Sequence, residues 1–222
     1  MAPKARPVQF LLWAGIVGPI IFVVTFTIDG ALTPGYSAIR DAVSYLALGR
    51  YGWIQAVNFV VLGILVIAFA LGFFRWWRRR DSSWVLPAAA LLIALSGLGY
   101  VLAAIFTANR PPQPPGPKHT LAFEIVFFAQ GLGCLLVGLR LLRRGVWRGL
   151  GWMSLIIMFL TVAAAAGNLS SIFTQAPRTP ISSPSGAFPL GGLFNRVLVL
   201  IAFIWYLVFA GRMLSDASAD SA

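Results

Sequence analysis

The 222-residue chain is 59% hydrophobic and only 10% charged, with a mean hydropathy of +0.85. A soluble globular domain carries about 25% charged residues, so this composition excludes one and predicts an integral membrane protein. The net charge of +11 does not indicate nucleic-acid binding, because the basic residues form short clusters between apolar segments, as in the loops of membrane proteins.

Six segments are long and apolar enough to cross a membrane, which takes about 20 helical residues for roughly 30 Å of hydrocarbon. In chain order they cover residues 8–28, 53–74, 84–108, 121–142, 150–173 and 193–213. Membrane strands would be about 9–11 residues long with alternating polarity, which these segments lack. The sequence therefore predicts an all-α bundle of six transmembrane helices that forms a single domain over residues 1–222.

The loops predict the orientation of the bundle, because cytoplasmic loops carry an excess of Lys and Arg. One set of helix ends holds eleven basic residues: Lys4, Arg6, Arg75, Arg78, Arg79, Arg80, Arg140, Arg143, Arg144, Arg148 and Arg212. The other set holds six: Arg40, Arg50, Arg110, Lys118, Arg178 and Arg196. We therefore expect both termini to be cytoplasmic in a multi-pass protein of the cell membrane.

The first outer loop contains a segment with helical periodicity. Ser37 is suited to cap a short helix over residues 37–48. One side of this helix would carry the apolar residues Ile39, Val43 and Leu46. The other side would carry the polar residues Arg40, Asp41 and Ser44. This pattern predicts an interfacial helix that closes the outer end of the bundle, with Asp41 and Ser44 facing inward.

Polar residues within the six segments gather in the predicted outer half. Polar groups inside a membrane are costly and usually face other helices or a cavity. We therefore predict an outward-facing polar pocket that binds a membrane lipid or a small amphipathic ligand. The candidate binding residues are Ser44, Asn58, Tyr100, His119, Glu124, Asn168 and Arg196. Ordinary hydrogen bonding between helices would also explain this distribution.

Two alternatives to a binding protein stay open. The first is a membrane-embedded enzyme that uses His119, Glu124 or Asp41 for acid–base chemistry on a hydrophobic substrate. The second is a structural partner of another membrane protein, whose identity the sequence does not give. With one histidine and one cysteine, the chain lacks the usual ligands of zinc or haem, so we expect neither a metal nor a cofactor.

Two charged residues lie about one turn inside their predicted helices at the outer side. They are Glu124 and Arg196. A charge at a helix centre costs about 2.5–3.5 kcal/mol, and less near the interface, so an ion pair would offset much of that cost. We therefore expect the carboxylate of Glu124 and the guanidinium of Arg196 to lie within salt-bridge reach, directly or through water. The alternative is that Arg196 extends to the lipid headgroups and Glu124 bonds a nearby hydroxyl.

Several motifs resemble those of an uncharacterised family of six-helix bacterial and archaeal membrane proteins, the family of domain of unknown function 998. They are GIVGP at 15–19, PGY at 34–36, DAVSYLALG at 41–49, Gly52-Trp53, Asn58-Phe59, Gly63, His119, Arg196-Val197 and Trp205. The resemblance covers nearly the whole chain and implies the same fold and topology, but no established activity, cofactor or substrate. It directs attention to Ser44, Asn58, His119 and Arg196. Where this family leads us to expect a short acidic turn after the third helix, the chain has Asn109-Arg110 and a proline run.

Overall fold

The computed structural model describes residues 6–109, 115–173 and 190–219, with the backbone alone for residue 6 and for residues 164–173. These residues form helices and no strand. The long helices are α1 (Arg6–Leu32), α2 (Gly52–Arg78), α3 (Val85–Ile105), α4 (Pro117–Leu141), α5 (Arg148–Phe173) and α6 (Gly191–Ala219). All six are long and apolar enough to cross a membrane, α5 together with the turn before it over Gly145–Ala163. This confirms the predicted six-helix architecture.

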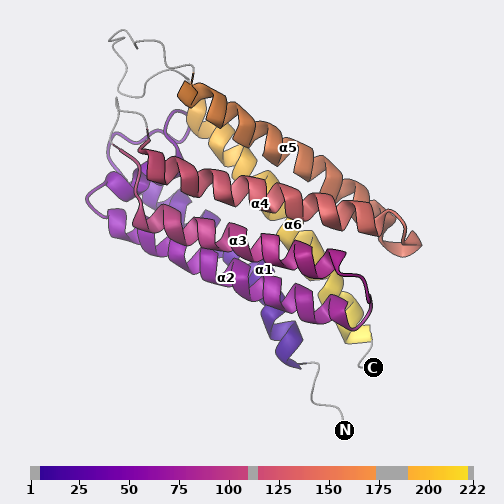
Figure 1. Ribbon diagram of the computed structural model, residues 1–222. Helices are drawn as coiled ribbons and strands as arrows, with labels where there is room; N and C mark the ends of the chain where they lie inside the picture. Colours follow the sequence, from indigo (N-terminus) through magenta and orange to yellow (C-terminus); the bar gives the residue numbers. More distant parts are fainter. Residues whose placement is uncertain (1–5, 110–114, 174–189, 220–222) are drawn as a thin grey trace.

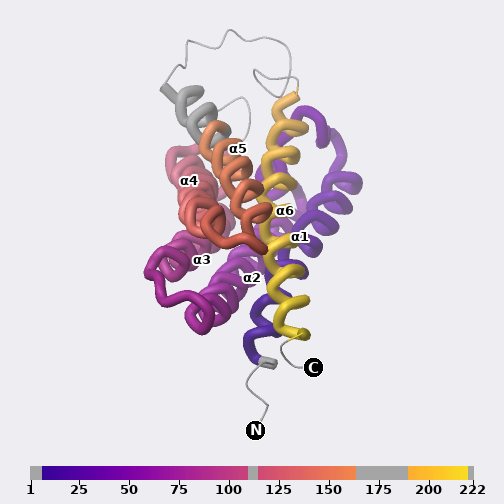
Figure 2. The backbone as a smooth tube through the Cα atoms, turned by 90° about the vertical axis from the view of Figure 1, so that its right-hand side faces the viewer, coloured from indigo at the N-terminus to yellow at the C-terminus, as the bar shows by residue number. Residues whose placement is uncertain are grey.

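The helices follow one another around the bundle. α2, α3, α4 and α5 lie side by side in chain order, and α1 and α6 lie behind them (Figure 1). α6 closes the arrangement between α1 and α5 (Figure 2). The start of α1 and the end of α6 lie at the same end of the bundle, which we name the inner end after the predicted orientation. The cytoplasmic location of that end remains a prediction.

Small residues bring consecutive helices into close contact. A Cβ atom on Gly63 of α2 would lie 2.5 Å from the carbonyl oxygen of Gly97 on α3, and a Cβ on Gly97 would lie 2.8 Å from the oxygen of Gly63. Gly99 faces Val126 of α4 in the same way, at 2.8 Å. Without a hydrophobic force between helices in lipid, such close backbone approach is a main source of association.

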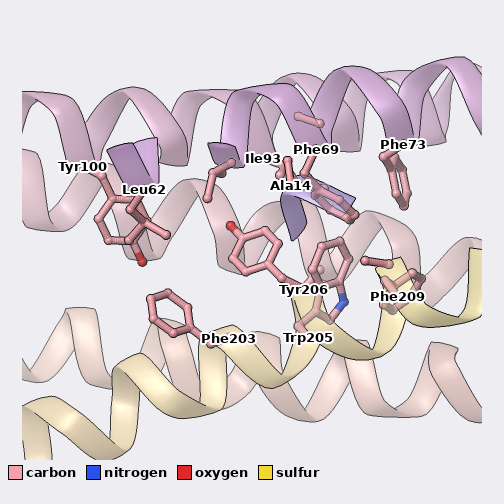
Figure 3. Close-up of a cluster of buried hydrophobic side chains, with 14 of the residues drawn as sticks. Ala14, Leu62, Phe69, Phe73, Ile93, Tyr100, Phe203, Trp205, Tyr206 and Phe209 are labelled. Carbon is pink, nitrogen blue, oxygen red and sulfur yellow. The ribbon is translucent and has the colours of Figure 1, made fainter. Parts of the chain in front are cut away.

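α6 packs differently, through large aromatic side chains in the centre of the bundle (Figure 3). Trp205 stacks on Phe209 with ring centroids 4.4 Å apart, and it meets Phe69 of α2 edge-on at 6.1 Å. The indole nitrogen of Trp205 donates a hydrogen bond to the hydroxyl of Ser154 on α5 at 2.9 Å. Bulky side chains therefore separate α6 from the helices that it faces across the core.

The inner end is held together by one buried carboxylate. Asp81, between α2 and α3, accepts two hydrogen bonds from Arg140 of α4, both at 2.9 Å, and forms a second salt bridge with Arg144 at 3.0 Å. The hydrogen bonds from Arg140 are the largest influence on this carboxyl group, and they lower the pKa of Asp81 against the opposing effect of burial. Its carboxylate also accepts the backbone N–H of Ser83 at 2.9 Å, so it fixes the turn that starts α3.

The first outer loop differs from its prediction. The helix begins at Val43 rather than at Ser37, and it is a 3-10 helix, η1 (Val43–Leu48). The segment before it is a tight turn, in which the backbone N–H of Asp41 donates to the carbonyl of Ser37 at 2.7 Å while the Asp41 carboxylate accepts the N–H of Ser37 at 2.7 Å. Val43 and Leu46 are buried, whereas Ile39 is 54% exposed because it belongs to the turn.

Candidate functional site

A small cavity lies at the outer end of the bundle. Its volume is about 50 Å³. Residues from α1, α2, α3, α4, α6 and η1 line it: Phe22, Val43, Ser44, Phe59, Tyr100, Ala103, His119, Phe123, Val126, Phe127, Asn195 and Val199. The predicted binding residues Ser44, Tyr100 and His119 thus come from three separate elements to one space.

Aromatic rings form much of the cavity wall. Phe22 of α1 packs against Phe59 of α2 with ring centroids 5.2 Å apart, and Phe123 packs against Phe127 within α4 at 4.4 Å. Phe22 also lies 6.3 Å from the ring of Tyr100 on α3. The wall is therefore apolar over most of its area, and the polar groups are few and separate.

His119 has a defined orientation in the first turn of α4. Its Nδ1 lies 2.8 Å from the carbonyl oxygen of Phe106, immediately after the end of α3. A carbonyl oxygen only accepts hydrogen bonds, so we assign the proton of the neutral imidazole to Nδ1, which leaves Nε2 as an acceptor. The same contact ties the outer ends of α3 and α4 together.

Tyr100 supplies a second polar group, and its hydroxyl makes no hydrogen bond with the described part of the chain. The residue is only 4% exposed, and its side chain reaches from α3 toward α6 above Phe203 (Figure 3). The hydroxyl of the other tyrosine in this view, Tyr206, lies 3.2 Å from the hydroxyl of Ser96. Buried polar groups without a partner are uncommon in native proteins, and each calls for an explanation.

Residues 36–44, which we name the lid segment, lie at the outer end of the bundle and reach the cavity at their last two positions. Val43 and Ser44 face the cavity, and the backbone N–H of Val43 donates to the side-chain oxygen of Asn195 at 3.1 Å. The first turn of α6 also bonds to the lid segment through its free N–H groups: that of Gly192 donates to Arg40 at 3.1 Å, and that of Leu193 to Ile39 at 2.9 Å. These bonds satisfy donors that a helix N-terminus otherwise leaves unpaired.

Arg196 strengthens this attachment. Its Nη1 donates to the carbonyl oxygens of Ala38 at 2.6 Å, Asp41 at 2.9 Å and Gly192 at 3.0 Å. Its Nη2 donates to the hydroxyl of Tyr36. Burial raises the pKa of Tyr36, and the adjacent guanidinium of Arg196 opposes that rise. The charge of Arg196 is thus used to hold the lid segment, and the residue does not line the cavity.

The expected pairing of Glu124 and Arg196 is not a direct one, and pairing through water stays a prediction. No salt bridge joins these two residues, both of which the structure describes, because the guanidinium is turned to the lid segment. Glu124 is buried on α4 beside Phe123, outside the residues that line the cavity. α4 and α6 both reach the cavity at the outer end, through His119 and Asn195.

The remaining predicted residues lie around the cavity rather than in its wall. Asn58 donates to the backbone oxygen of Phe22 at 3.1 Å, so it links α2 to α1 behind the cavity. Asp41 uses its carboxylate in the turn of the lid segment. The side chain of Asn168 lies outside the described residues.

Comparison with known proteins places the chain in a family. Residues 16–212 match the family model described as "Protein of unknown function (DUF998)". The chain belongs to this family. Nothing among the curated proteins or the solved structures matches it. The description of the family gives no function, so the use of the site has to be argued from its residues.

Several residues of the cavity in this DUF998 protein were not among the sequence candidates. The four phenylalanines lie on helices that are apolar on every side, so periodicity does not distinguish a cavity wall from a lipid-facing surface. Asn195 was visible as a polar residue next to Arg196, but its bond to Val43, 152 positions earlier in the chain, has no sequence signal. Within the described residues, no group of three or more His, Cys, Asp and Glu side chains is placed to hold a metal ion.

Proposed function

We propose that the outer cavity binds a lipid or a small amphipathic molecule from the membrane. The observation that carries this proposal is the composition of the cavity wall, in which four phenylalanines surround a few separate polar groups. Sites for small ligands typically combine an apolar lining with a small number of placed polar groups. The concentration of polar residues in the outer half of the bundle adds to this support.

The size of the cavity limits how much of such a ligand it receives. A volume of about 50 Å³ is enough for a few water molecules. Pockets for drug-sized ligands measure about 300–1,000 Å³, so a whole lipid does not fit. We therefore propose that the cavity takes one end of the molecule, while the remainder stays between the helices or in the bilayer.

Binding has more support than acid–base catalysis. Among the described residues that line the cavity, His119 is the one with an imidazole, the usual acid–base group of proteins, and none has a carboxylate. General acid–base catalysis of the kind that we considered needs two titratable groups facing one substrate. Of the two carboxylate candidates, Asp41 bonds to its own loop and Glu124 lies outside the cavity wall.

The proposal is tested by filling the cavity from one side. Ala103 of α3 lines the cavity, whereas the adjacent Ala104 packs against the core without lining it. We expect Ala103→Leu to abolish the binding of added single-chain amphiphiles and Ala104→Leu to leave it intact. The measurement is native mass spectrometry of protein released from nanodiscs, with thermal stability as a check on folding.

The proposal is overturned if no amphiphile adduct forms with the native chain. It is also overturned if Ala103→Leu and Ala104→Leu, both folded, retain the same adducts as the native chain. Either result would leave the cavity as a packing feature of the bundle.

A further inference from the structure

We infer that the cavity selects a neutral head group that both donates and accepts hydrogen bonds, in the first place a hydroxyl, held between His119 and Tyr100. This inference rests on the proposed function, and it specifies the chemical class of the ligand. It depends on three observations: the acceptor left on His119, the hydroxyl left without a partner on Tyr100, and the absence of charged side chains from the cavity wall.

The acceptor is the Nε2 atom of His119, and it is assigned from the hydrogen bond that Nδ1 makes at the other side of the ring. Because Nδ1 donates to the carbonyl of Phe106 at 2.8 Å, Nε2 carries the lone pair. His119 is only 8% exposed, and it lines the cavity. A ligand next to Nε2 must therefore bring a hydrogen-bond donor.

The donor is the hydroxyl of Tyr100. It is buried and has no partner among the described residues, and Tyr100 is one of the residues that line the same cavity. Asn195 adds a second donor, since its side-chain oxygen already accepts the N–H of Val43 and its amide NH₂ group is a donor. A ligand in this space must therefore also accept a hydrogen bond, and a hydroxyl group does both.

The cavity wall offers no opposite charge to an ionic head group. The described residues of the lining include no Asp, Glu, Lys or Arg. The guanidinium of Arg196 on α6, which holds the lid segment, donates to three backbone carbonyls and a tyrosine hydroxyl. A phosphate or an ammonium group would lose its hydration here without gaining an opposite charge, which is far more costly than burying a hydroxyl.

The test compares four probes that share one alkyl chain and differ only in the head: 1-decanol, decane, decylamine and decyl phosphate. Affinities are measured on the full-length protein in nanodiscs by native mass spectrometry and by ligand-dependent thermal shift. We expect 1-decanol to bind about tenfold or more tightly than each of the other three, because two hydrogen bonds are formed and no charge is buried.

Two variants assign the preference to the two side chains. His119→Asn retains a donor near the position of Nδ1 and removes the Nε2 acceptor, and Tyr100→Phe removes the unpaired hydroxyl. Each should weaken 1-decanol binding about threefold to tenfold and leave decane binding unchanged. Tyr206→Phe is the matched control, because it removes a buried hydroxyl that already pairs with Ser96 and lies outside the cavity wall.

The ligand-free proteins give a second, independent readout. Removing a hydroxyl that has no partner should leave the unfolding temperature of Tyr100→Phe at or above that of the native chain, whereas Tyr206→Phe should unfold at a lower temperature. A lower unfolding temperature for Tyr100→Phe would mean that its hydroxyl is already paired, and the inference would be overturned.

The remaining outcomes separate the two proposals. If the four probes bind equally, or decyl phosphate or decylamine binds best, the inference about the head group is wrong while the binding function stands. If 1-decanol binds best but neither variant weakens it, the head group lies elsewhere and the assigned residues are wrong. If none of the probes binds, the proposed function itself is refuted, and this inference is refuted with it.

Discussion

The attachment of the lid segment to α6 is tested by adding a single methyl group at Gly192. A Cβ atom there would lie 2.5 Å from the carbonyl oxygen of Asp41 and 2.7 Å from that of Ala38. Both neighbours are backbone atoms, so the lid segment would have to move by about 1 Å to restore ordinary contact, at an overpacking cost of about 1–3 kcal/mol. The same movement would weaken the hydrogen bonds from Gly192 and Leu193, worth about 1 kcal/mol each.

The gain in helix propensity, about 1 kcal/mol for replacing Gly by Ala, offsets part of this cost. We therefore expect Gly192→Ala to lower the free energy of unfolding by about 2–3 kcal/mol, or the melting temperature by roughly 4–12 °C for a chain of this size. Gly211 lies on the same helix with open space around its Cβ position, so Gly211→Ala should be neutral or slightly stabilising.

The assay combines thermal unfolding in detergent with hydrogen exchange over the lid segment. Exchange of residues 36–44 should accelerate in Gly192→Ala and stay unchanged in Gly211→Ala, because only the first variant opens the contact between the lid segment and α6. If Gly192→Ala is as stable as Gly211→Ala and the lid segment exchanges at the native rate, the lid segment is not held by the first turn of α6.

Three further outcomes are expected. Arg196→Lys should lower the free energy of unfolding by about 1–2 kcal/mol and accelerate hydrogen exchange in the lid segment. The reason is that one ammonium group cannot replace a guanidinium that reaches three carbonyls and a tyrosine hydroxyl. Native stability in this variant would count against the role of Arg196. The pKa of Asp81 is lowered in the folded protein, so its ionised carboxylate stabilises the fold fully above the unfolded pKa of about 3.9. This stabilisation is lost as the pH falls through the lower pKa of the folded state. Asp81→Asn should thus cost about 1.5–3 kcal/mol at pH 7 and progressively less below pH 4 in thermal unfolding, and a difference that does not depend on pH would refute this explanation. An impermeant maleimide on intact cells should label Gly116→Cys and not Pro3→Cys, with no background from the fully buried Cys134; the reverse pattern would invert the predicted orientation.

The membrane-spanning architecture could be predicted because it depends on average hydropathy over long segments. The limits of the helices were less predictable, since they depend on local hydrogen bonds. α4 begins at Pro117, four residues before the predicted start, where the backbone N–H of Thr120 donates to the carbonyl of Gly116 at 3.0 Å. The lid segment illustrates the same limit: Ser37 fits a helix cap by residue type, yet the carboxylate of Asp41 takes its N–H and closes a turn instead.

The candidate site could be predicted in part. Which atoms accept the hydrogen bonds of Arg196 could not be predicted. Burial cost correctly indicated that Arg196 needs partners, but it does not say which acceptors supply them. The backbone carbonyls of Ala38 and Asp41 are as suitable as a carboxylate. Residue type does not single them out, because every residue has a backbone carbonyl. His119 and Tyr100 were predictable as polar residues of the outer half, whereas their convergence on one cavity depends on the angles between α3, α4 and α6.

The location of the cavity follows from the way α6 packs. Where glycines line both surfaces, as at Gly63 and Gly97, the backbones touch and no space is left between helices. α6 instead meets the centre of the bundle through rings such as Trp205 and Tyr206, which keep its backbone away from α3 and α4. Toward the outer end these large side chains give way to Ala202, Val199 and Asn195, one helical turn apart, while the separation set by the rings persists. A space therefore opens there, and Val43 and Ser44, where the lid segment meets η1, line it on the outer side. The same arrangement predicts which parts can move: the glycine-packed helices are fixed by backbone contact, so a ligand that enters has to displace the lid segment or the outer turns of α6.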